Sequence, residues 1–389
     1  MNEFFADLHI HIGRTKTGKP VKITGAKSLT LENILAEASE SKGMDMIGII
    51  DCHVPEVIET LEDGIKSGVY KELADGGIRY QNTTLIIGTE LEIYDKNCQG
   101  PIHVLCFMPT LAEMKGFSHW LEPRLKNIHL SSQRVYAEGK ELQHKVVQLG
   151  GLFIPAHIFT PFKSLYGKGV NRSLTEVFDC HLIDAVELGL SSDTNMASGI
   201  RELSVFPFLT NSDAHSLAKI GREYQKLLLK APTFKELVMA IRAVEGRIIA
   251  ANYGLNPKLG KYYETHCETC GKMIHLTEDK RCPICGSHKV VKGVKRRIAE
   301  LSDQKAGAHK RPPYIHQVPL AFLPGVGPKT LAKLKDHFGT EMNILHKAPY
   351  EELVQVIPEK IAALIISARE GKLSVQSGGG GKYGKVIGA

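Results

Sequence analysis

The chain has 389 residues, of which 43% are hydrophobic and 23% charged, and a formal net charge of +7. This length allows two or three domains, and no run is long and apolar enough to cross a membrane, so we expect no membrane partner. The first six residues (MNEFFA) carry an acid and lack the basic region of a signal peptide, which predicts a cytoplasmic protein.

The excess of positive charge lies in the last third of the chain. Residues 1–254 hold 27 Lys and Arg against 30 Asp and Glu, residues 255–311 hold 13 against 6, and residues 312–389 hold 9 against 6. A basic segment alone is more often a solvated surface. Because this one coincides with two modules typical of nucleic-acid-binding proteins, we interpret it as a surface for a polyanion.

Apolar, strand-like runs alternate with helical stretches through residues 1–255. The helical stretches are residues 31–42, 135–149 and 234–244. This order predicts an α/β fold with a parallel sheet or barrel. Five short segments place metal-binding side chains at the end of such a run, namely Asp7 with His9 and His11, Asp51 with His53, Glu90, His157, and Asp213 with His215.

These side chains are expected to converge on one site. His9 and His11 alternate along a strand, so both imidazoles point to the same face, and the C-terminal ends of buried strands gather at one face of a barrel-like fold. One such histidine pair is usually an ordinary core or loop feature, but five segments in register predict a multinuclear metal site. Imidazole with carboxylate favours zinc, manganese or iron, whereas a magnesium-only site would use few histidines. Glu90 has two oxygens with which to bridge two ions.

The order of these motifs resembles the PHP (polymerase and histidinol phosphatase) family over roughly residues 1–250. The resemblance implies a distorted (β/α)7-type barrel at residues 1–255 that hydrolyses phosphoesters with two or three divalent ions (zinc, manganese, magnesium or iron). Carried over by position, it assigns His9, His11, Glu90 and Asp213 to one ion, Glu90, His103 and His157 to a second, and His215 with Asp51 or His53 to a third. Asp213 and Glu90 would be the catalytic residues, with Asp213 orienting the attacking water. Glu187 is a candidate outer partner of a ligand.

A small cysteine module occupies residues 256–312 together with a basic connector. Cys267 and Cys270 form one CxxC pair, and Cys282 and Cys285 form a second, eleven residues further on. Each pair is followed by a glycine that permits a tight knuckle, and two knuckles supply four thiolates for tetrahedral zinc. With four thiolates no position is left for water, so we predict a structural zinc rather than a redox pair or a disulfide. Lys272, Lys280 and Arg281 would stand on its surface.

Residues 323–334 (LPGVGPKTLAKL) have the form of a helix-hairpin-helix motif. Gly325 and Gly327 permit close backbone approach, and the amides of the following helix, with Lys329, Thr330 and Lys333, can grip a phosphate oxygen. Residues 352–366 look like a degenerate second hairpin. We therefore predict an α-helical DNA-binding domain at residues 313–376, with a protein-interaction domain as the alternative, and a flexible glycine-rich tail at residues 377–389.

The barrel, the zinc module and the hairpin domain, in this order, resemble the endonuclease Q family over nearly the whole chain. The resemblance implies a metal-dependent endodeoxyribonuclease of DNA repair. Its partner would be DNA, cut 5′ to deaminated bases (uracil, hypoxanthine or xanthine) or to abasic sites. The base would be extruded into a pocket, for which Phe159, Phe162 and Tyr166 are candidates.

Three alternatives stay open from the residues alone. They are a small-molecule phosphatase of the histidinol-phosphate type, a DNA nuclease without lesion specificity, and a DNA-binding scaffold with an inactive barrel. Recruitment by a sliding clamp also stays open.

Overall fold

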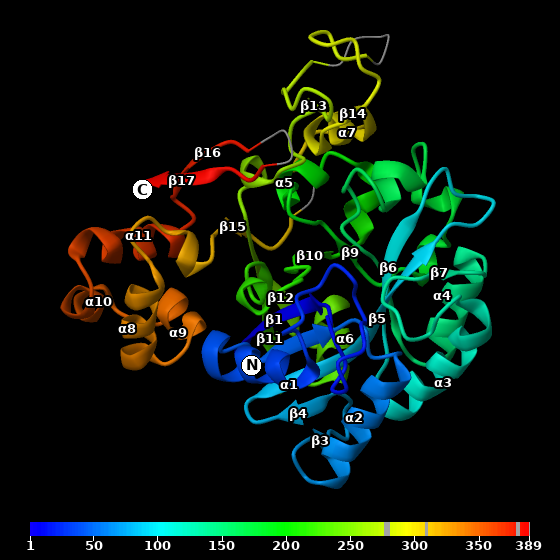
Figure 1. The fold of residues 1–389 in the computed structure, drawn as a ribbon, viewed down its shortest axis with the longest axis horizontal. Coiled ribbons are helices and arrows are strands. Elements are labelled where there is room, and N and C mark those ends of the chain that lie inside the picture. The colour runs from blue at the N-terminus through cyan, green and yellow to red at the C-terminus, as the bar shows by residue number, and fades with distance from the viewer. Residues whose placement is uncertain (276–280, 308–309, 379–381, 389) are drawn as a thin grey trace.

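One mixed sheet forms the centre of the molecule, with helices packed around it (Figure 1). The computed structural model describes residues 1–275, 281–307, 310–378 and 382–388. The eleven strands of this sheet are β1 (Asn2–Ile10), β2 (Met46–Ile49), β3 (Lys71–Glu72), β4 (Ile78–Tyr80), β5 (Thr83–Ile93), β6 (Ile102–Phe107), β7 (Arg134–Val135), β8 (Leu152–Pro155), β11 (Tyr224–Leu229), β12 (Ile248–Gly254) and β15 (Tyr314–His316). A separate parallel pair is formed by β9 (Val186–Glu187) and β10 (Phe208–Leu209).

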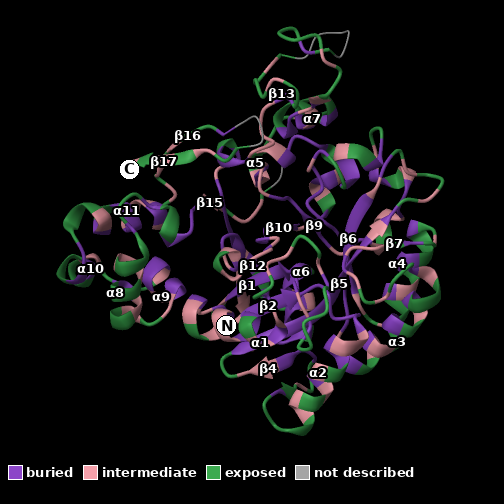
Figure 2. Cartoon of the chain, in the orientation of Figure 1, coloured by how far each residue is buried: buried purple, intermediate pink, exposed green. Residues whose placement is uncertain are grey.

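The helices of the first 255 residues bury apolar side chains. They are α1 (Leu31–Ala36) continued by η1 (Glu37–Lys42), α2 (Pro55–Lys66), α3 (Leu111–Leu121), α4 (Gly139–Gln148), α5 (Thr194–Ala197) and α6 (Phe234–Ile241). Of these helices, α3, α4 and α6 contact strands of the sheet. In α6, for example, Phe234, Leu237 and Ile241 are buried. Every residue of β2 and of β6 is buried, which explains why their sequences are continuous apolar runs (Figure 2).

The strand directions differ in part from the parallel sheet that we predicted. β1, β2 and β5 pair in parallel, but β6 pairs antiparallel with both β5 and β8, and β11 pairs antiparallel with β1 and β12. The short connection between β5 and β6 permits only the antiparallel arrangement. As a result, the C-terminal ends of β1, β2, β5 and β8 and the N-terminal end of β6 share one edge of the sheet.

The C-terminal third forms two further parts. The cysteine module contains the antiparallel pair β13 (His266–Cys267) and β14 (Val290–Val291), followed by helix α7 (Val294–Leu301). The hairpin domain contains α8 (Pro328–Phe338), α9 (Glu341–His346), α10 (Tyr350–Val356) and α11 (Glu359–Arg369). Among the described residues, no helix combines the length and the apolar character that a membrane crossing needs.

The hairpin domain is attached to the central sheet and to its helices. β15, which precedes the domain, pairs in parallel with β12 and so extends the sheet. A buried ion pair joins Lys42 Nζ to Glu341 Oε1 at 2.9 Å. The His346 ring stacks on Phe5 with 4.3 Å between ring centroids, and its Nε2 lies 2.7 Å from the Tyr224 hydroxyl. These contacts fix the position of the helices relative to the barrel.

The segment that we predicted as a flexible tail contains a strand. Strand β17 (Lys385–Gly388) pairs antiparallel with β16 (Ser374–Gln376). The Gly378 amide donates to the Lys258 carbonyl oxygen at 2.7 Å, and the Gly384 amide donates to the Leu259 oxygen at 2.9 Å. Backbone hydrogen bonds, which a glycine-rich composition does not reveal, hold this hairpin against the connector that follows the barrel.

Candidate metal centre and DNA-binding modules

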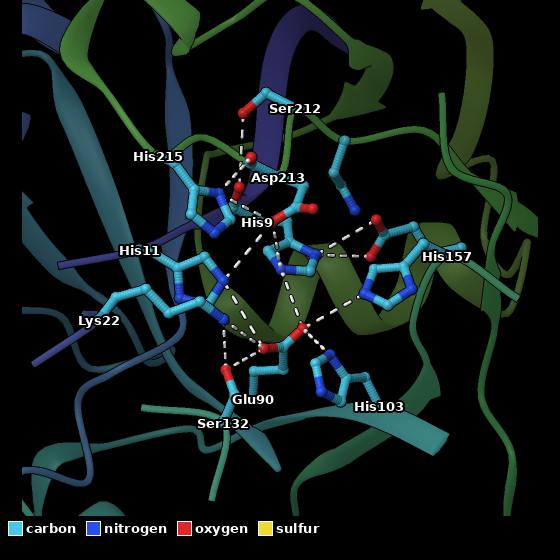
Figure 3. A network of polar contacts seen from close by, with 12 residues as sticks. His9, His11, Lys22, Glu90, His103, Ser132, His157, Ser212, Asp213 and His215 are labelled. Atoms are coloured by element: carbon cyan, nitrogen blue, oxygen red, sulfur yellow. Dashed lines mark hydrogen bonds and ion pairs between the residues drawn. The ribbon is translucent and has the colours of Figure 1, made fainter. Parts of the chain in front are cut away.

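The metal-binding side chains predicted from the sequence gather at the shared edge of the sheet (Figure 3). His9 is near the end of β1 and His11 follows that end, while His157 follows β8 and Asp213 follows β10. His9, His11 and His157 therefore come from the ends of strands in the central sheet, and Asp213 comes from the loop after the separate β9–β10 pair.

Glu90 and His103 reach the same place from a hairpin. Glu90 lies in the last part of β5, whereas His103 lies near the start of β6. In this antiparallel pair His103 is opposite Glu92, so the beginning of β6 lies beside the end of β5. Topology thus explains how a residue at the start of a strand joins residues at the ends of others.

The carboxylate of Glu90 is at the centre of the cluster. Its Oε1 lies 2.9 Å from His103 Nδ1 and 3.4 Å from His157 Nε2, and its Oε2 lies 3.6 Å from His11 Nε2. Burial raises the pKa of Glu90, but the His103 imidazole and the Lys22 ammonium outweigh it, so the pKa falls well below its ordinary value. An ionised carboxylate with different partners on its two oxygens is suited to bridging two cations.

Asp213 faces the same histidines from the opposite side. Its Oδ1 lies 3.4 Å from His9 Nε2, 3.5 Å from His11 Nε2 and 3.5 Å from His215 Nδ1. Its side chain is 31% exposed, whereas His9 and His11 are fully buried, so it can meet solvent and a substrate. Asp213 and His157 both have a left-handed backbone, with φ of +46° and +32°. Such strain costs about 1–3 kcal/mol per non-glycine residue and persists where the surroundings impose it.

Two carboxylates hydrogen-bond to the imidazole rings of His9 and His11 and so orient them. Glu187 Oε2 accepts from His9 Nδ1 at 2.9 Å, and Asp51 Oδ2 accepts from His11 Nδ1 at 3.1 Å. A carboxylate accepts here, so each ring carries a proton on Nδ1 and directs its Nε2 toward Glu90 and Asp213. This carboxylate–histidine arrangement is the usual outer support of a metal-ligating imidazole.

Several ring nitrogens of the cluster are buried without a hydrogen-bond partner. They are Nε2 of His9, His11, His53 and His103, and Nδ1 of His157. An isolated buried nitrogen of this kind is costly, and a divalent cation would satisfy several of them at once. Burial also lowers the pKa of His215 to about 4, which keeps that imidazole neutral and able to ligate. The donor set therefore fits zinc, manganese or iron.

Within this cluster, three sets of described side chains each bring their potential ligand atoms within 4.8 Å of one another. They are His9, His11 and Glu90; Glu90, His103 and His157; and His11, Asp213 and His215. Asp51 and His53 are in none of these groups. Asp51 lies behind His11 and also accepts from the Ile12 amide, and His53 Nδ1 lies 2.6 Å from Thr89 Oγ1. Asp51 Oδ1 and His53 Nε2 are nevertheless buried without a hydrogen-bond partner, so the assignment of Asp51 or His53 to a third ion stays a prediction.

Two polar residues of the cluster were missed by the sequence analysis. Lys22 Nζ lies 3.2 Å from Glu90 Oε2 and 2.6 Å from Ser132 Oγ, and Ser132 also donates to Glu90. Both residues come from loops, away from any strand end, and a lysine or serine in a loop has no distinctive spacing. No signal in the sequence marked them.

A cavity of about 350 Å³ opens beside the cluster. Asp213, His157 and Arg222 line it from the barrel, and Lys261 and Tyr383 line it from the connector and the tail hairpin. The volume and the mixture of basic and aromatic side chains suit a planar polar group attached to a phosphate.

The three aromatic residues proposed for a base pocket do not line that cavity. Phe159 and Tyr166 are buried and stack on each other at 5.4 Å. Phe162 is exposed and contacts Tyr262 edge-on at 5.2 Å. Phe159 and Phe162 instead line a second cavity, of about 530 Å³, beside the cysteine module, so their role toward a base stays a prediction. Tyr262 lines the cavity beside the metal cluster.

The four cysteines of the module converge as predicted. Their sulfur atoms all lie within 4.8 Å of one another, with 3.6 Å between Cys267 and Cys285 and 3.7 Å between Cys270 and Cys282. The knuckle glycines that follow, Gly271 and Gly286, have φ of +66° and +72°. Lys272 and Arg281 are exposed on the module, and Lys280 lies outside the described residues.

The segment predicted as a helix-hairpin-helix motif places its glycines and lysines at the start of α8. Gly325 has φ of +88°, and Gly327 caps the N-terminus of α8. Lys329 and Lys333 are exposed and Thr330 is half-buried, whereas Leu334 on the inner side is fully buried. The first turn of α8 and its lysines therefore face solvent together.

Comparison with known proteins places this architecture in a family. Residues 197–245 match a family model described as PHP-associated. The lesion-specific endonuclease PfuEndoQ from Pyrococcus furiosus superimposes with a TM-score of 0.85 and 32% identity over 99% of this chain and 95% of that one. The chain belongs to the endonuclease Q family. This confirms the predicted fold class, a PHP-type barrel with a four-cysteine cluster.

Three further proteins are similar to this chain, over different shares of its length. The structure of endonuclease Q in complex with a 27-mer duplex substrate, with an abasic lesion at the active site, gives a TM-score of 0.84 and 32% identity over 100% of this chain and 97% of that one. YqxK of Bacillus subtilis is 63% identical over 99% of this chain and its own full length. MJ0043 of Methanocaldococcus jannaschii is 40% identical over 59% of this chain and 31% of its own length.

Proposed function

We propose that this protein is a metal-dependent endonuclease of DNA repair. It hydrolyses the phosphodiester on the 5′ side of a deaminated base (uracil, hypoxanthine or xanthine) or of an abasic site. The observation that carries the proposal is the cluster of imidazoles and carboxylates, with its buried unpartnered nitrogens, in a chain that aligns along its length with a lesion-specific endonuclease.

The ligand assignments follow the geometry. His9, His11, Glu90 and Asp213 would hold one ion, and Glu90, His103 and His157 a second. When bound, such ions lower the pKa of a coordinated water and neutralise charge on the phosphate. Asp213, the more exposed carboxylate, accepts a hydrogen bond from the attacking water and orients it. Glu90 would be a ligand of both ions and would set their separation.

The remaining parts would bring DNA to this edge of the barrel. Lys329, Thr330 and Lys333 at α8 contact the phosphate backbone without reading sequence. A structural zinc on Cys267, Cys270, Cys282 and Cys285 holds the small module together. The cavity beside Asp213 receives the extruded nucleotide, where Arg222 and Lys261 supply charge and Tyr262 supplies a stacking face.

A substrate panel tests the proposal. We expect the metal-loaded protein to nick a duplex that contains one deoxyuridine, one deoxyinosine or one abasic site, and to spare the same duplex without a lesion. Equal cutting of lesion-free DNA would leave a nuclease without lesion specificity. Hydrolysis of a small phosphate monoester without any DNA cleavage would favour a phosphatase instead.

A further inference from the structure

The hairpin of β16 and β17 (red in Figure 1) contributes to the wall of the cavity beside Asp213. Tyr383, just before β17, lines this cavity of about 350 Å³ together with Lys261 and Tyr262 of the connector. Asp213 lines the same cavity from the barrel. Residues far apart in the sequence thus enclose one space, and the last hairpin of the chain reaches the site where a nucleotide would lie.

The hairpin holds Tyr383 in a fixed place. The Gly384 amide, next to Tyr383 in the chain, donates to the Leu259 carbonyl oxygen at 2.9 Å. Val375 and Val386 are partners in the strand pair, and both are half-buried and pack against the main hydrophobic core. The backbone of Tyr383 is therefore positioned by the connector and by the core, without any contribution from a ligand.

Two tyrosine rings flank an ammonium at this wall. Lys261 Nζ lies 4.8 Å from the centroid of the Tyr262 ring and 6.0 Å from that of the Tyr383 ring. Tyr262 also stacks on His266, with 6.2 Å between the ring centroids. Tyr383 is 42% exposed, so its ring can meet a ligand that enters the cavity. A cation with aromatic rings suits a planar, electron-rich group carried on a phosphate.

The lesions named in the proposed function differ in whether they carry such a group. Uracil, hypoxanthine and xanthine have a planar ring with a π-face, whereas an abasic sugar has none. Stacking of a base on an aromatic side chain tolerates different bases, because every base has a π-face. A contact with the Tyr383 ring would therefore be made by all three deaminated bases and would be missing at an abasic site.

We propose that the C-terminal hairpin, through the ring of Tyr383, stacks on the base of the extruded nucleotide and so supports incision at lesions that carry a base. Abasic sites are cut without this contact. The inference rests on the proposed function, which assigns the cavity to the nucleotide, and it adds a residue that distinguishes two classes of lesion.

Substitution of the tyrosine tests this role. The metal-loaded, full-length protein cuts one duplex sequence that carries deoxyuridine, deoxyinosine or an abasic site at the same position. Tyr383→Ala should cut the first two about 10- to 100-fold more slowly than the parent and the abasic duplex within about twofold of it. Tyr383→Phe keeps the ring and should cut all three as the parent does. Single-turnover rates measure the effect.

A second variant moves the hairpin without changing the tyrosine. A Cβ atom at Gly384 would overlap the Gln376 carbonyl oxygen, so Gly384→Val should displace the segment that carries Tyr383. We expect the same selective loss at deoxyuridine and deoxyinosine. Ile387→Ala is the matched control, because Ile387 is 64% exposed on the same hairpin and does not line the cavity. It should cut all three duplexes as the parent does.

Two results would overturn the inference. Rates of Tyr383→Ala within about threefold of the parent at deoxyuridine and deoxyinosine would show that the ring is dispensable. Equal slowing at all three lesions would show that the hairpin supports the fold or general DNA binding instead.

A parent protein that cuts none of the three duplexes would refute the proposed function. Fluorescence anisotropy with the same duplexes then decides the inference. Weaker binding of the deoxyuridine duplex by Tyr383→Ala, with unchanged binding of the abasic duplex, would support it. Equal binding of both duplexes by the parent and the variant would refute it.

Discussion

Asp213 combines a left-handed backbone with a carboxylate that touches three histidines and solvent. Burial raises the pKa of Asp213, but the imidazoles of His9, His11 and His215 outweigh it, so the pKa lies well below its ordinary value. The residue is thus ionised at neutral pH and placed where a ligand and a water acceptor are both needed. The backbone strain at this residue indicates that packing fixes its position before any ligand binds.

Asp213→Asn should lower incision by about 100-fold or more while DNA binding stays within about threefold, because the amide loses the charge that holds metal and orients water. Nicking rates and gel shifts on the same preparation measure both effects. Asp63→Asn, on the exposed side of α2, is the control for the same chemical change. Residual nicking within tenfold of the parent would contradict the role of Asp213.

Glu187 hydrogen-bonds to His9, which is one of the proposed metal ligands. Because it fixes the Nδ1 proton of His9, Glu187→Gln should weaken metal binding in the barrel by about 10- to 100-fold without affecting the cysteine module. Competition with a chelator dye measures the affinity, and the exposed Glu59→Gln is the control. Unchanged affinity would mean that Glu187 has a purely structural role.

At the scale of elements, the strand ends were predictable and the loops were not. Continuous apolar runs predicted β2, β5 and β8. The proposed ligands that lie late in such runs or directly after them gather in the cluster. β6 runs antiparallel to β5, and His103 therefore joins the site from the start of a strand. The sequence did not reveal this reversal, because the short connection between the two strands is its only sign. The resemblance implied that Asp51 or His53 joins His215 at a third ion. In the structure the chain turns after Ile49, and the two side chains contact different partners, His11 and Thr89.

The cysteine module has little buried apolar surface of its own, so a bound ion is expected to hold it. Cys285→Ser should remove about one equivalent of zinc and make residues 261–292 more susceptible to proteolysis, with the barrel metals retained. Elemental analysis and limited proteolysis follow the two effects. Cys98→Ser, a half-buried thiol of the barrel, is the control. An unchanged zinc content in Cys285→Ser would refute the structural site.

In the proposed function, the lysines of helix α8 contact the DNA backbone. Replacing Lys329 and Lys333 together by Gln should weaken binding to all DNA sequences and reduce the slope of log K against log salt by about 1–2, because fewer counterions are released. The preference for a lesion should not change, since the cavity lies on the barrel. Lys66→Gln, exposed on α2, is the control. A changed lesion preference with an unchanged salt slope would contradict this division of roles.

At the scale of the whole molecule, the hairpin domain is not a detachable unit. β15 is a strand of the central sheet, and the contacts of Glu341 with Lys42 and of His346 with Phe5 bury polar and aromatic groups between the parts. Sequence patterns identified each module, but these contacts join residues about 300 positions apart and leave no local trace. The fixed arrangement means that the spacing between the α8 lysines and Asp213 is set by the fold, so a duplex held at α8 meets the barrel at a defined distance.

The central claim is that this fixed geometry cuts DNA at one place relative to a lesion. The most direct measurement is the position of the nick on end-labelled duplexes that carry a single deoxyuridine, resolved to one nucleotide. We predict a single cut on the 5′ side of the lesion, moving with it when the lesion is placed elsewhere, and absent in Asp213→Asn. Cuts at positions unrelated to the lesion, or none in the metal-loaded parent protein, would contradict the account.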